Sequence, residues 1–510
     1  MTSRGGNYLL LAFLLLIAPI GATSLSAQPG SAWFDPTRID NAPLSEPVRS
    51  SHQGEYNGKS IFFDVIAGEL LMLGQDGEPA ATLFSTAYVR TDAGAAASRP
   101  VLFLFNGGPG ASSSPLHLGI GPMRRPEDDP DSALVPNPLS PIDAVDMVFV
   151  DPVGTGYTRL LKEGAGEQFW GIEPDANAIL YLIKSWLKQN SRTGSPVFIM
   201  GESYGGARAA AMAGQAEDVN ISGVLLLSPA LDFSAGTQVV GNNLPYMFLL
   251  PSMAATAVYH GVVDANGRGY LQVFNDAAKF AQSEYAAALY QGNAISPEEK
   301  KTVAQQLSQL IGLPAEYIAD KNLRVNSSDF GDQLLAKEAM RVGRLDARAK
   351  GLLADYKDQR PPGNDPSMSG NRNAGRSTGE VLDEYYAGPL GIKIDRPYRT
   401  LNLDLNQKWD YGQKQGFTSY ISVAPQLQDA MQRHADLRVW VGGGVFDLGT
   451  PIMAARYTTN QIDAVPERFV FAGYEGGHTV FEHEESRKAL CEDIRQFVAE
   501  TILLANGNGR

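Results

Sequence analysis

Seven short apolar runs, separated by segments with helical patterns, most strongly constrain the fold of this 510-residue chain. They cover residues 60–65, 101–105, 147–150, 197–200, 223–227, 439–441 and 468–471. Several are apolar throughout, as expected of central strands that helices cover on both faces. Alternation of such runs with helices is typical of an α/β sheet, in which ligands bind beyond the carboxyl ends of the strands. We therefore expect the functional residues in the Gly-rich or polar loops that follow these runs.

The composition excludes several classes of protein and of site. Hydrophobic residues make up 44% and charged residues 19%, which is a globular balance. The formal net charge of −14 argues against non-specific nucleic-acid binding, because such binding requires a basic surface. A single cysteine, Cys491, cannot form an intramolecular disulfide or a Cys-rich metal site, and the histidines are few and scattered. We expect no nucleic-acid partner, no metal and no cofactor.

The N-terminus predicts a secretory signal peptide over residues 1–27. Arg4 precedes an uncharged apolar run over residues 8–20, and small residues follow up to Ala27. The alternative is a membrane anchor, but this run is short for a bilayer core of about 30 Å. No later segment is apolar enough to span a membrane, and a secreted chain without disulfides fits a bacterial periplasm or exterior. We predict a periplasmic or secreted protein without stable membrane insertion after cleavage.

Residues 235–400 differ from the rest because they indicate helices without obvious buried strands. Ser296 and Pro297 predict the start of one helix, with Ser296 as the cap and Glu299 completing a capping box. We predict a core formed by residues 28–234 and 401–510, with residues 235–400 inserted as a helical cap over the sheet. The alternative is that the inserted residues form an independent helical domain.

The pentapeptide Gly201-Glu202-Ser203-Tyr204-Gly205 predicts a nucleophilic serine. It matches G-x-S-x-G, follows the apolar run at residues 197–200 and precedes an Ala-rich helix, which is the context of a nucleophile elbow. The glycines allow the strained turn that exposes the serine hydroxyl, and the following helix N-terminus favours developing negative charge. The alternative is an ordinary turn serine.

A nucleophilic serine needs a base, and the base needs a carboxylate that orients it. Among the histidines, only His478 lies in a Gly-flanked loop directly after a predicted late strand. Asp447 is the only acid in the loop that follows the run at residues 439–441. The chain order Ser203, Asp447, His478 is that of the α/β-hydrolases. We therefore predict this fold, with a mostly parallel central sheet covered by helices.

Acyl transfer also requires hydrogen-bond donors for the tetrahedral oxyanion. One donor should be the backbone N–H of Tyr204, directly after the nucleophile. The other should come from residues 106–110, N-G-G-P-G, where missing side chains let backbone N–H groups approach a ligand. The alternatives are a plain Gly-rich turn and a dinucleotide site, although the G-x-G-x-x-G pattern of the latter is absent here.

Taken in order, these segments resemble the serine carboxypeptidase family, the S10 peptidases. Residues 106–113 resemble the family's N-G-G-P-G-[CAS]-S-S segment, and residues 151–157 resemble D-x-P-x-G-x-G-[YF] with one residue fewer. Residues 201–206 match G-E-S-Y-[GA]-G. Asp447 with Pro451 matches the D-x-x-x-P spacing around the catalytic acid, and residues 477–478 match a G-H segment. The five motifs cover most of the chain.

The resemblance implies a serine-type carboxypeptidase that acts on peptides through an acyl-enzyme on Ser203. It implies His478 as the base and Asp447 as the residue that orients it. It also implies that the backbone N–H groups of Gly108 and Tyr204 form the oxyanion hole. Neither a metal nor an organic cofactor is implied.

The resemblance further implies that Asn106, the Gly107 N–H and Glu202 bind the C-terminal carboxylate of the substrate. A carboxyl buried beside the elbow would have a raised pKa. When protonated, Glu202 can donate a hydrogen bond to an incoming carboxylate, and when ionised it would repel one. This predicts better peptide binding at acidic pH. The alternative is a structural acid that is bonded to the backbone of the turn.

The chain departs from the family pattern at three places. The family usually has a second Glu two residues before a G-P pair, and no acid is present in the corresponding residues 117–122. His117 or Arg124 is an alternative contact for the carboxylate. Ala111 lies where the family often has a Cys, and residues 442–444 are all Gly in place of the common G-D-x-D pattern.

Two other functions compete with a carboxypeptidase. An esterase or acyltransferase would use the same fold and triad without a carboxylate site, and the missing second Glu favours it. A non-catalytic binding or protective protein is the further alternative, and the intact Ser203, Asp447 and His478 argue against it.

Overall fold

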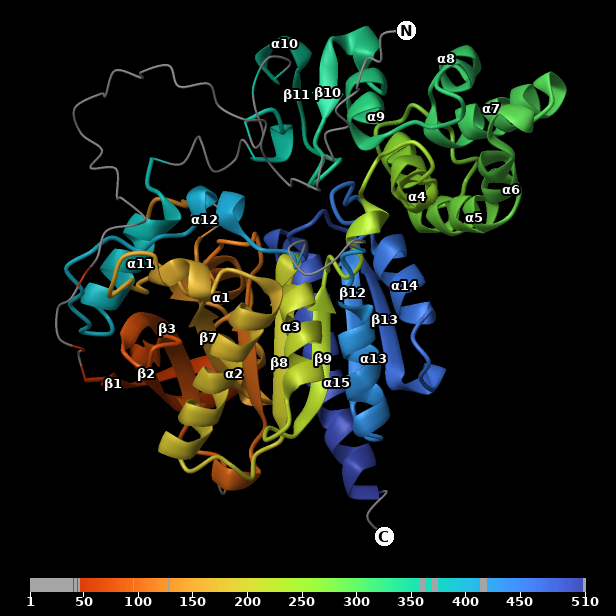
Figure 1. The fold of residues 1–510 in the computed structure, drawn as a ribbon. Helices are drawn as coiled ribbons and strands as arrows, with labels where there is room; N and C mark the ends of the chain where they lie inside the picture. Colours follow the sequence, from red (N-terminus) through yellow and green to blue (C-terminus); the bar gives the residue numbers. More distant parts are fainter. Residues whose placement is uncertain are drawn as a thin grey trace, which may run out of the picture.

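The computed structural model describes residues 40, 44, 46–94, 96–126, 129–356, 359, 363–368, 375–412 and 420–507. These residues form a central nine-stranded sheet with helices on both faces (Figure 1). The strands, in spatial order, are β1 (Val48–Tyr56), β2 (Lys59–Leu73), β3 (Pro79–Arg90), β7 (Asp146–Asp151), β4 (Val101–Phe105), β8 (Val197–Glu202), β9 (Ile221–Leu227), β12 (Arg438–Gly444) and β13 (Phe469–Tyr474). The predicted signal peptide, residues 1–27, lies outside the described residues.

The sheet is parallel from β7 through β13 and antiparallel from β1 to β7. Each of the seven apolar runs falls in one of its strands, apart from Arg468, which directly precedes β13, and this confirms the predicted central sheet. The sequence pattern missed β1 and β3. Alternate residues of β1 are exposed at the sheet edge, so it has no apolar run. Strand β3 is largely buried, but Ala, Ser and Thr interrupt its large apolar residues.

Two apolar clusters cover the two faces of the sheet. Residues Val101, Phe103 and Phe105 of β4 lie in one cluster, whereas Leu102 and Leu104 lie in the other, because successive side chains of a strand point to opposite faces. Helices α2 (Ile172–Gln189), α3 (Tyr204–Gln215) and α13 (Ala424–Arg433) contribute to the first cluster. Helices α1 (Ser114–Ile120), α11 (Thr378–Ala387) and α15 (Glu484–Gly507) contribute to the second.

A third apolar cluster holds the helices of the predicted insertion together. These helices are α4 (Leu244–Tyr259), α5 (Tyr270–Gln282), α6 (Glu284–Gln291), α7 (Pro297–Ile311), α8 (Ala315–Asp320) and α9 (Ser327–Gln333), and they lie beyond the ends of the strands (Figure 1). Val445, Phe446 and Leu448, from the loop after β12, belong to the same cluster. The insertion therefore packs on a loop at the carboxyl ends of the strands.

The predicted insertion also contains strands. A short antiparallel hairpin, β10 (Met340–Val342) and β11 (Lys350–Leu352), follows α9. Its strands are too short to produce a recognisable apolar run. At the predicted helix start, Ser296 accepts the Glu299 N–H at 3.1 Å, but the Glu299 carboxylate accepts from Gln291 instead.

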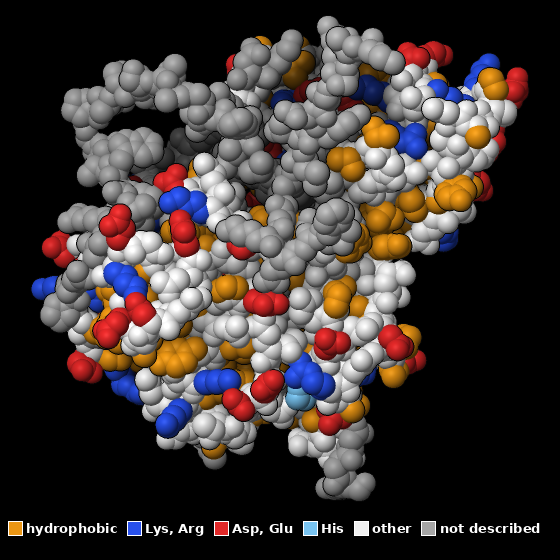
Figure 2. Space-filling model, viewed as in Figure 1, with side chains coloured by type: hydrophobic (Ala, Val, Ile, Leu, Met, Phe, Trp, Pro, Cys, Tyr) orange, Lys and Arg blue, Asp and Glu red, His pale blue; other side chains and the backbone are white. Residues whose placement is uncertain are grey.

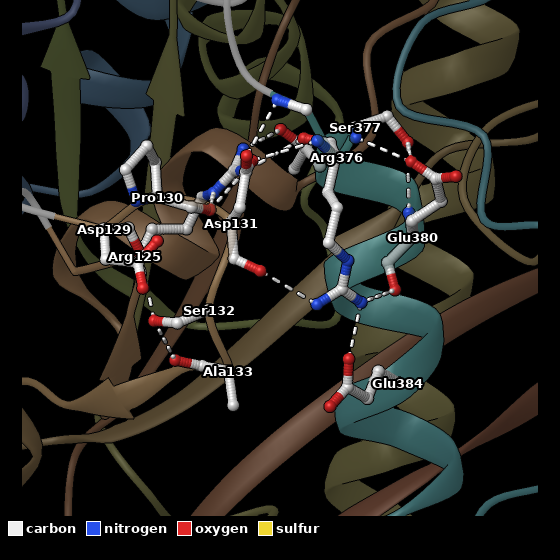
Figure 3. Close-up of polar contacts among 12 residues, drawn as sticks. Arg125, Asp129, Pro130, Asp131, Ser132, Ala133, Arg376, Ser377, Glu380 and Glu384 are labelled. Carbon is white, nitrogen blue, oxygen red and sulfur yellow. Dashed lines mark hydrogen bonds and ion pairs between the residues drawn. The ribbon is translucent and has the colours of Figure 1, made fainter.

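Helix α11 is attached to the core by a cluster of polar contacts (Figure 3). The Asp131 carboxylate accepts the backbone N–H groups of Gly375 and Arg376, each at 2.9 Å. Arg125 donates to the Arg376 carbonyl at 3.0 Å, and Ser377 caps the helix in a full capping box with Glu380. The helix packs in the second core cluster although it falls inside residues 235–400, and the boundaries of the cap stay a prediction.

The surface charge and the helices relate to two predictions, the lack of nucleic-acid binding and the lack of a later membrane-spanning segment. On the face shown in Figure 2, acidic and basic side chains are interspersed and not gathered by sign. The lack of nucleic-acid binding stays a prediction. No helix within the described ranges combines the length and the apolar character needed to cross a membrane.

Candidate active site

The turn between β8 and α3 has the strained form that the sequence predicts. Ser203 has a φ of +60°, a conformation that is rare for a residue with a side chain. A Cβ at Gly201 would lie 1.9 Å from the Gly205 carbonyl oxygen, so only glycine fits there. The Ser203 N–H donates to Leu227 at 2.9 Å, and its carbonyl accepts from Ala230 at 3.1 Å. The turn is thereby bonded to β9 and to the loop that follows it.

The structure brings His478 and Asp447 together. The Nδ1 atom of His478 lies 2.8 Å from Oδ2 of Asp447, which is fully buried. The other carboxylate oxygen accepts the N–H groups of Gly449 at 2.7 Å and of Thr450 at 3.0 Å. These bonds hold the carboxylate in place, so that its second oxygen, Oδ2, faces the imidazole.

The electrostatics of this pair suit a base and its orienting acid. Burial opposes ionisation of Asp447, but the His478 imidazole and the hydrogen bonds from Thr450 outweigh it and hold the pKa of the carboxyl below its ordinary value. Burial also lowers the pKa of His478, but the Asp447 carboxylate outweighs it and the net shift is upward. An ionised acid on Nδ1 leaves Nε2 as the nitrogen that exchanges protons.

Two residues that the sequence analysis did not single out support this pair. The Thr450 hydroxyl lies 2.8 Å from Asp447 Oδ2 and 2.9 Å from His478 Nδ1. The Ser228 hydroxyl donates to the His478 carbonyl at 2.8 Å. The Asp-x-Gly-Thr spacing in the sequence indicates that Thr450 contacts Asp447, because an Asp side chain often accepts hydrogen bonds from backbone N–H groups two or three residues further along the chain.

The hairpin loop between β10 and β11 connects the insertion to both members of the pair. The His478 N–H donates to the Leu345 carbonyl at 2.6 Å, and the Leu448 N–H donates to the Arg344 carbonyl at 2.9 Å. The Ala347 N–H donates to the Phe446 carbonyl at 3.0 Å. No sequence motif marks this loop, so its role in holding the site becomes visible only in three dimensions.

The loop at residues 106–110 lies directly on the N-terminus of α3. A Cβ at Gly107 would lie 2.4 Å from the Tyr204 nitrogen and 2.6 Å from that of Gly205. Gly108 has a φ of +99°, which favours glycine. The two predicted oxyanion donors, Gly108 and Tyr204, therefore belong to backbones in close contact, but their role stays a prediction.

Two side chains hold this loop in place. The Arg208 guanidinium of α3 donates to the Asn106 carbonyl and forms a buried ion pair with Asp175. Asn406, in helix α12 (Leu403–Lys408), donates through its side-chain amide to the Pro109 carbonyl at 3.0 Å. These contacts place the Asn106 side chain beside Glu202.

Glu202 is a buried carboxyl with one oxygen to spare. Its Oε2 accepts from the Asn106 side-chain amide, whose oxygen accepts the Leu116 N–H at 3.1 Å. Its Oε1 has no hydrogen-bond partner among the described residues. Burial, partly opposed by the His478 imidazole, raises the pKa of Glu202 to about 7. The side chain therefore holds a proton in weakly acidic solution, and one of its oxygens is buried without a hydrogen-bond partner among the described residues.

The place of the family's second Glu is filled by an aromatic ring. Gly119 lies two residues before Gly121-Pro122, and a Cβ at Gly119 would lie 2.1 Å from the ring of Phe481. No side chain can be added at Gly119 unless Phe481 moves. The sequence departure thus has a packing counterpart, since the ring of Phe481 lies where a side chain at residue 119 would begin.

His117 packs in the core, which argues against the alternative that it binds a carboxylate. Its Nε2 lies 2.6 Å from the Tyr88 hydroxyl, and its ring stacks on Phe149 with 4.4 Å between centroids. Burial lowers the pKa of His117 to about 3, so the ring is neutral at physiological pH. The other alternative, Arg124, donates to the carbonyl of Arg125 at 3.2 Å.

The sequence profile of the serine carboxypeptidase family, peptidase S10, matches residues 80–472. The chain belongs to this family. No curated protein matches it in sequence. Within the described residues, no group of His, Cys, Asp and Glu side chains is arranged to hold a metal ion.

Several solved structures are similar to this serine carboxypeptidase family member. Kex1Δp, a prohormone-processing carboxypeptidase from Saccharomyces cerevisiae, matches with a TM-score of 0.50 and 15% identity over 85% of this chain and 91% of that chain. VinJ matches with a TM-score of 0.37 and 14% identity over 85% and 98% of the two chains. The peroxisomal α/β-hydrolase Lpx1 from S. cerevisiae matches with a TM-score of 0.40 and 11% identity over 87% and 90%. The match with Kex1Δp, together with the mostly parallel central sheet, confirms the predicted α/β-hydrolase fold.

We predict that His117 makes the fold sensitive to acid. Its folded pKa of about 3 lies below the unfolded value of 6.5, so the unfolded state binds an extra proton between these values. The contribution to stability is full above pH 6.5, and about 1.4 kcal/mol is lost per pH unit as the pH falls towards 3. His117→Gln, measured by urea unfolding from pH 7 to 4, should lack this loss. His483→Gln, at an exposed histidine, is the control, and parallel curves for His117→Gln and wild type would contradict the prediction.

Glu202 should have the opposite effect on stability. Its folded pKa of about 7 lies above the ordinary 4.5, so the folded state binds an extra proton between these values. The stability that this proton provides is full below pH 4.5 and is lost as the pH rises through 7. Glu202→Gln should therefore raise the free energy of unfolding by about 3 kcal/mol at pH 8 and leave it nearly unchanged at pH 4. An equal effect at both pH values would show that Glu202 titrates normally, and Glu467→Gln, at an exposed acid, is the control.

Proposed function

We propose that this chain is a serine-type carboxypeptidase that releases C-terminal residues from peptides. The observation that carries the proposal is the buried Glu202 carboxyl, bonded to Asn106 beside the elbow and with a spare oxygen. A protonated carboxyl in this position is suited to bind the carboxylate that only the end of a peptide presents. Membership of the serine carboxypeptidase family supports peptide substrates.

The reaction begins when the Ser203 hydroxyl attacks the carbonyl of the last peptide bond and its proton passes to Nε2 of His478. Asp447 holds the protonated imidazole through Nδ1, at the observed 2.8 Å. The negative oxygen of the tetrahedral intermediate accepts from the N–H groups of Gly108 and Tyr204. His478 then returns the proton to the leaving amine, and the acyl group stays on Ser203 as an ester. Water, deprotonated by the same imidazole, hydrolyses this ester.

The terminal carboxylate binds at Glu202, Asn106 and the Gly107 N–H. The protonated Glu202 carboxyl donates one hydrogen bond to it, and the two nearby N–H donors add others. Because an ionised Glu202 would face another anion in a buried site, binding should weaken as the pH rises through about 7. An amide or ester at the end of the substrate would lose this interaction.

An esterase or acyltransferase is the second candidate function. The observation that favours it is the Phe481 ring at Gly119, which leaves Glu202 without the family's second acid. A non-catalytic protein is disfavoured, because the Asp447–His478 hydrogen bond would serve no purpose in it.

We also propose that residues 235–400 form a cap that closes the site, as an enzyme that acts on chain ends requires. Their contacts with the loop after β12 support this arrangement. On the signal-peptide pattern of residues 1–27, the mature protein would be periplasmic or secreted.

The first test compares N-blocked dipeptides that end in a free carboxylate or in an amide, at about pH 5 and pH 7.5, with Ser203→Ala as the blank. We expect strong preference for the free carboxylate at the lower pH. Equal hydrolysis of both substrates, or cleavage of simple esters only, would support the esterase. Failure of a fluorophosphonate probe to label Ser203 would instead support a non-catalytic protein.

Glu202→Gln should change how peptide hydrolysis depends on pH. Above pH 7, KM of the wild type for the free-acid dipeptide should rise about tenfold per pH unit, because only the protonated fraction binds. The Gln amide donates a hydrogen bond without titrating, so KM of the variant should stay level from pH 5 to 8. The amide dipeptide, which has no carboxylate, is the matched control. Parallel pH profiles for both enzymes would assign the dependence to another group.

A further inference from the structure

Arg344 lies in the hairpin loop that is bonded to His478 and to Leu448, the residue after Asp447. Its N–H donates to the buried Asp365 carboxylate at 3.0 Å, and its carbonyl accepts from Leu448 at 2.9 Å. The next residue, Leu345, donates to Asp365 at 3.2 Å and accepts from the His478 N–H at 2.6 Å. The backbone at Arg344 is therefore held on both sides, independently of its side chain.

The Arg344 guanidinium is the unused part of this residue. Its Nη1 lies 3.3 Å from the point that a Cβ at Gly449 would occupy, and Asp447 Oδ1 lies 3.2 Å from the same point. Within the described residues, the half-buried guanidinium makes neither a hydrogen bond nor an ion pair. The neighbouring arginines differ, because Arg341 pairs with Asp332 and Arg348 pairs with Asp346. A cation with free donors thus lies next to the candidate catalytic acid.

The strand order indicates which part of a substrate passes this cation. The loop with Asn106 follows β4, Ser203 follows β8, and Gly449 lies in the loop after β12. Since the sheet order is β4-β8-β9-β12, Asn106 and Gly449 lie on opposite sides of the nucleophile. A peptide with its terminal carboxylate at Asn106 therefore extends its acyl part towards Gly449.

A small apolar cavity lies on this acyl side. It has a volume of about 30 Å³, and Leu231, Phe233, Gly449 and Pro451 contribute to its lining. Gly449 borders both the cavity and the Arg344 guanidinium. The apolar lining suits methylene groups, and the carboxylate that also lines the cavity, that of Asp232, already accepts hydrogen bonds from Ser234 and Tyr420. Arg344 lies outside this lining, so its guanidinium would meet the charged end of a side chain that extends past Gly449.

We propose that Arg344 binds the side-chain carboxylate of an acidic residue at the penultimate position of the substrate. The enzyme would then release the last residue preferentially from peptides that end in Glu-X or Asp-X. Arginine suits this role because its fork of N–H donors can bind a carboxylate through two hydrogen bonds. The inference rests on the proposed carboxypeptidase function, since it assumes that the last peptide bond is cleaved.

The test uses N-blocked Glu-Phe, Gln-Phe and Lys-Phe at pH 5.5, where most of the substrate Glu is ionised and most of Glu202 is protonated. For the wild type we expect kcat/KM for Glu-Phe to exceed that for Gln-Phe by tenfold or more, as for hydrogen bonds to charged groups. Arg344→Gln should bring this ratio to about one; the ratio compares two substrates in the same enzyme, so a change in the pKa of His478, which the Arg344 charge lowers, affects both substrates alike. Arg344→Glu should reverse the preference in favour of Lys-Phe.

Lys350→Gln is the matched control, because it removes one positive charge from the same hairpin at an exposed residue, and it should retain the wild-type ratio. Arg344→Lys, which keeps the charge but not the fork, should retain part of it. A wild-type ratio near one would overturn the inference even if every variant failed to fold. An equal loss on Glu-Phe and Gln-Phe in Arg344→Gln would also overturn it, and would assign Arg344 to the terminal carboxylate or to the structure.

Failure of the proposed function is recognised separately. If Gln-Phe and its C-terminal amide are hydrolysed equally, the enzyme does not recognise the terminal carboxylate. The proposed carboxypeptidase function and the inference about Arg344 are then both wrong. If the free acid is preferred but the Glu-to-Gln ratio does not depend on Arg344, only the inference about Arg344 fails.

Discussion

The sharp turn at Ser203 determines where the other parts of the site can lie. Its positive φ is unfavourable for a residue with a side chain. The backbone around the turn is packed so closely that its neighbouring glycines cannot be replaced by residues with a Cβ. Gly201 meets the Gly205 carbonyl, and Gly107 meets the nitrogens at the start of α3, with no room for a Cβ in either case. These contacts join the loops after β4 and β8 into one unit. The predicted nucleophile, oxyanion donors and carboxylate-binding residues all lie on it.

The buried titratable groups near this unit have opposite effects on stability. Between pH 4.5 and 6.5, His117 takes up an extra proton on unfolding, whereas Glu202 gives one up. Their contributions to the pH dependence cancel in this window, because one slope is positive and the other negative. Below pH 4.5, protonation of His117 on unfolding lowers the stability as the pH falls. Above pH 6.5, Glu202 lowers the stability as the pH rises, until its carboxyl is ionised in the folded state. Throughout the range in which these two groups leave stability level, Glu202 is protonated and can donate a hydrogen bond to a carboxylate.

The sequence predicts those parts of the molecule whose residues are close together along the chain. Strand β4 was recognisable because helices cover both of its faces, so all of its residues are apolar. The elbow was recognisable because its glycines and Ser203 are neighbours. Strand β1 was not, since an edge strand with one exposed face has no apolar run.

Other parts of the site depend on contacts between distant segments. The bonds of the hairpin loop to Leu448 and His478 join backbone atoms, and a backbone hydrogen bond leaves no trace in the residue types. The missing second Glu was visible at Gly119, but its replacement by the Phe481 ring was not, because nothing in the sequence places these two segments together.

The hairpin holds the site through its backbone, whereas the selectivity proposed for it depends on one side chain. Backbone atoms of Arg344 and Leu345 bond to the loops of Asp447 and His478, and Asp365 orders the hairpin from its other side. None of these bonds uses the Arg344 guanidinium. A change of side chain at this position therefore leaves in place the bonds that orient the base, but it removes a positive charge that lowers the pKa of His478.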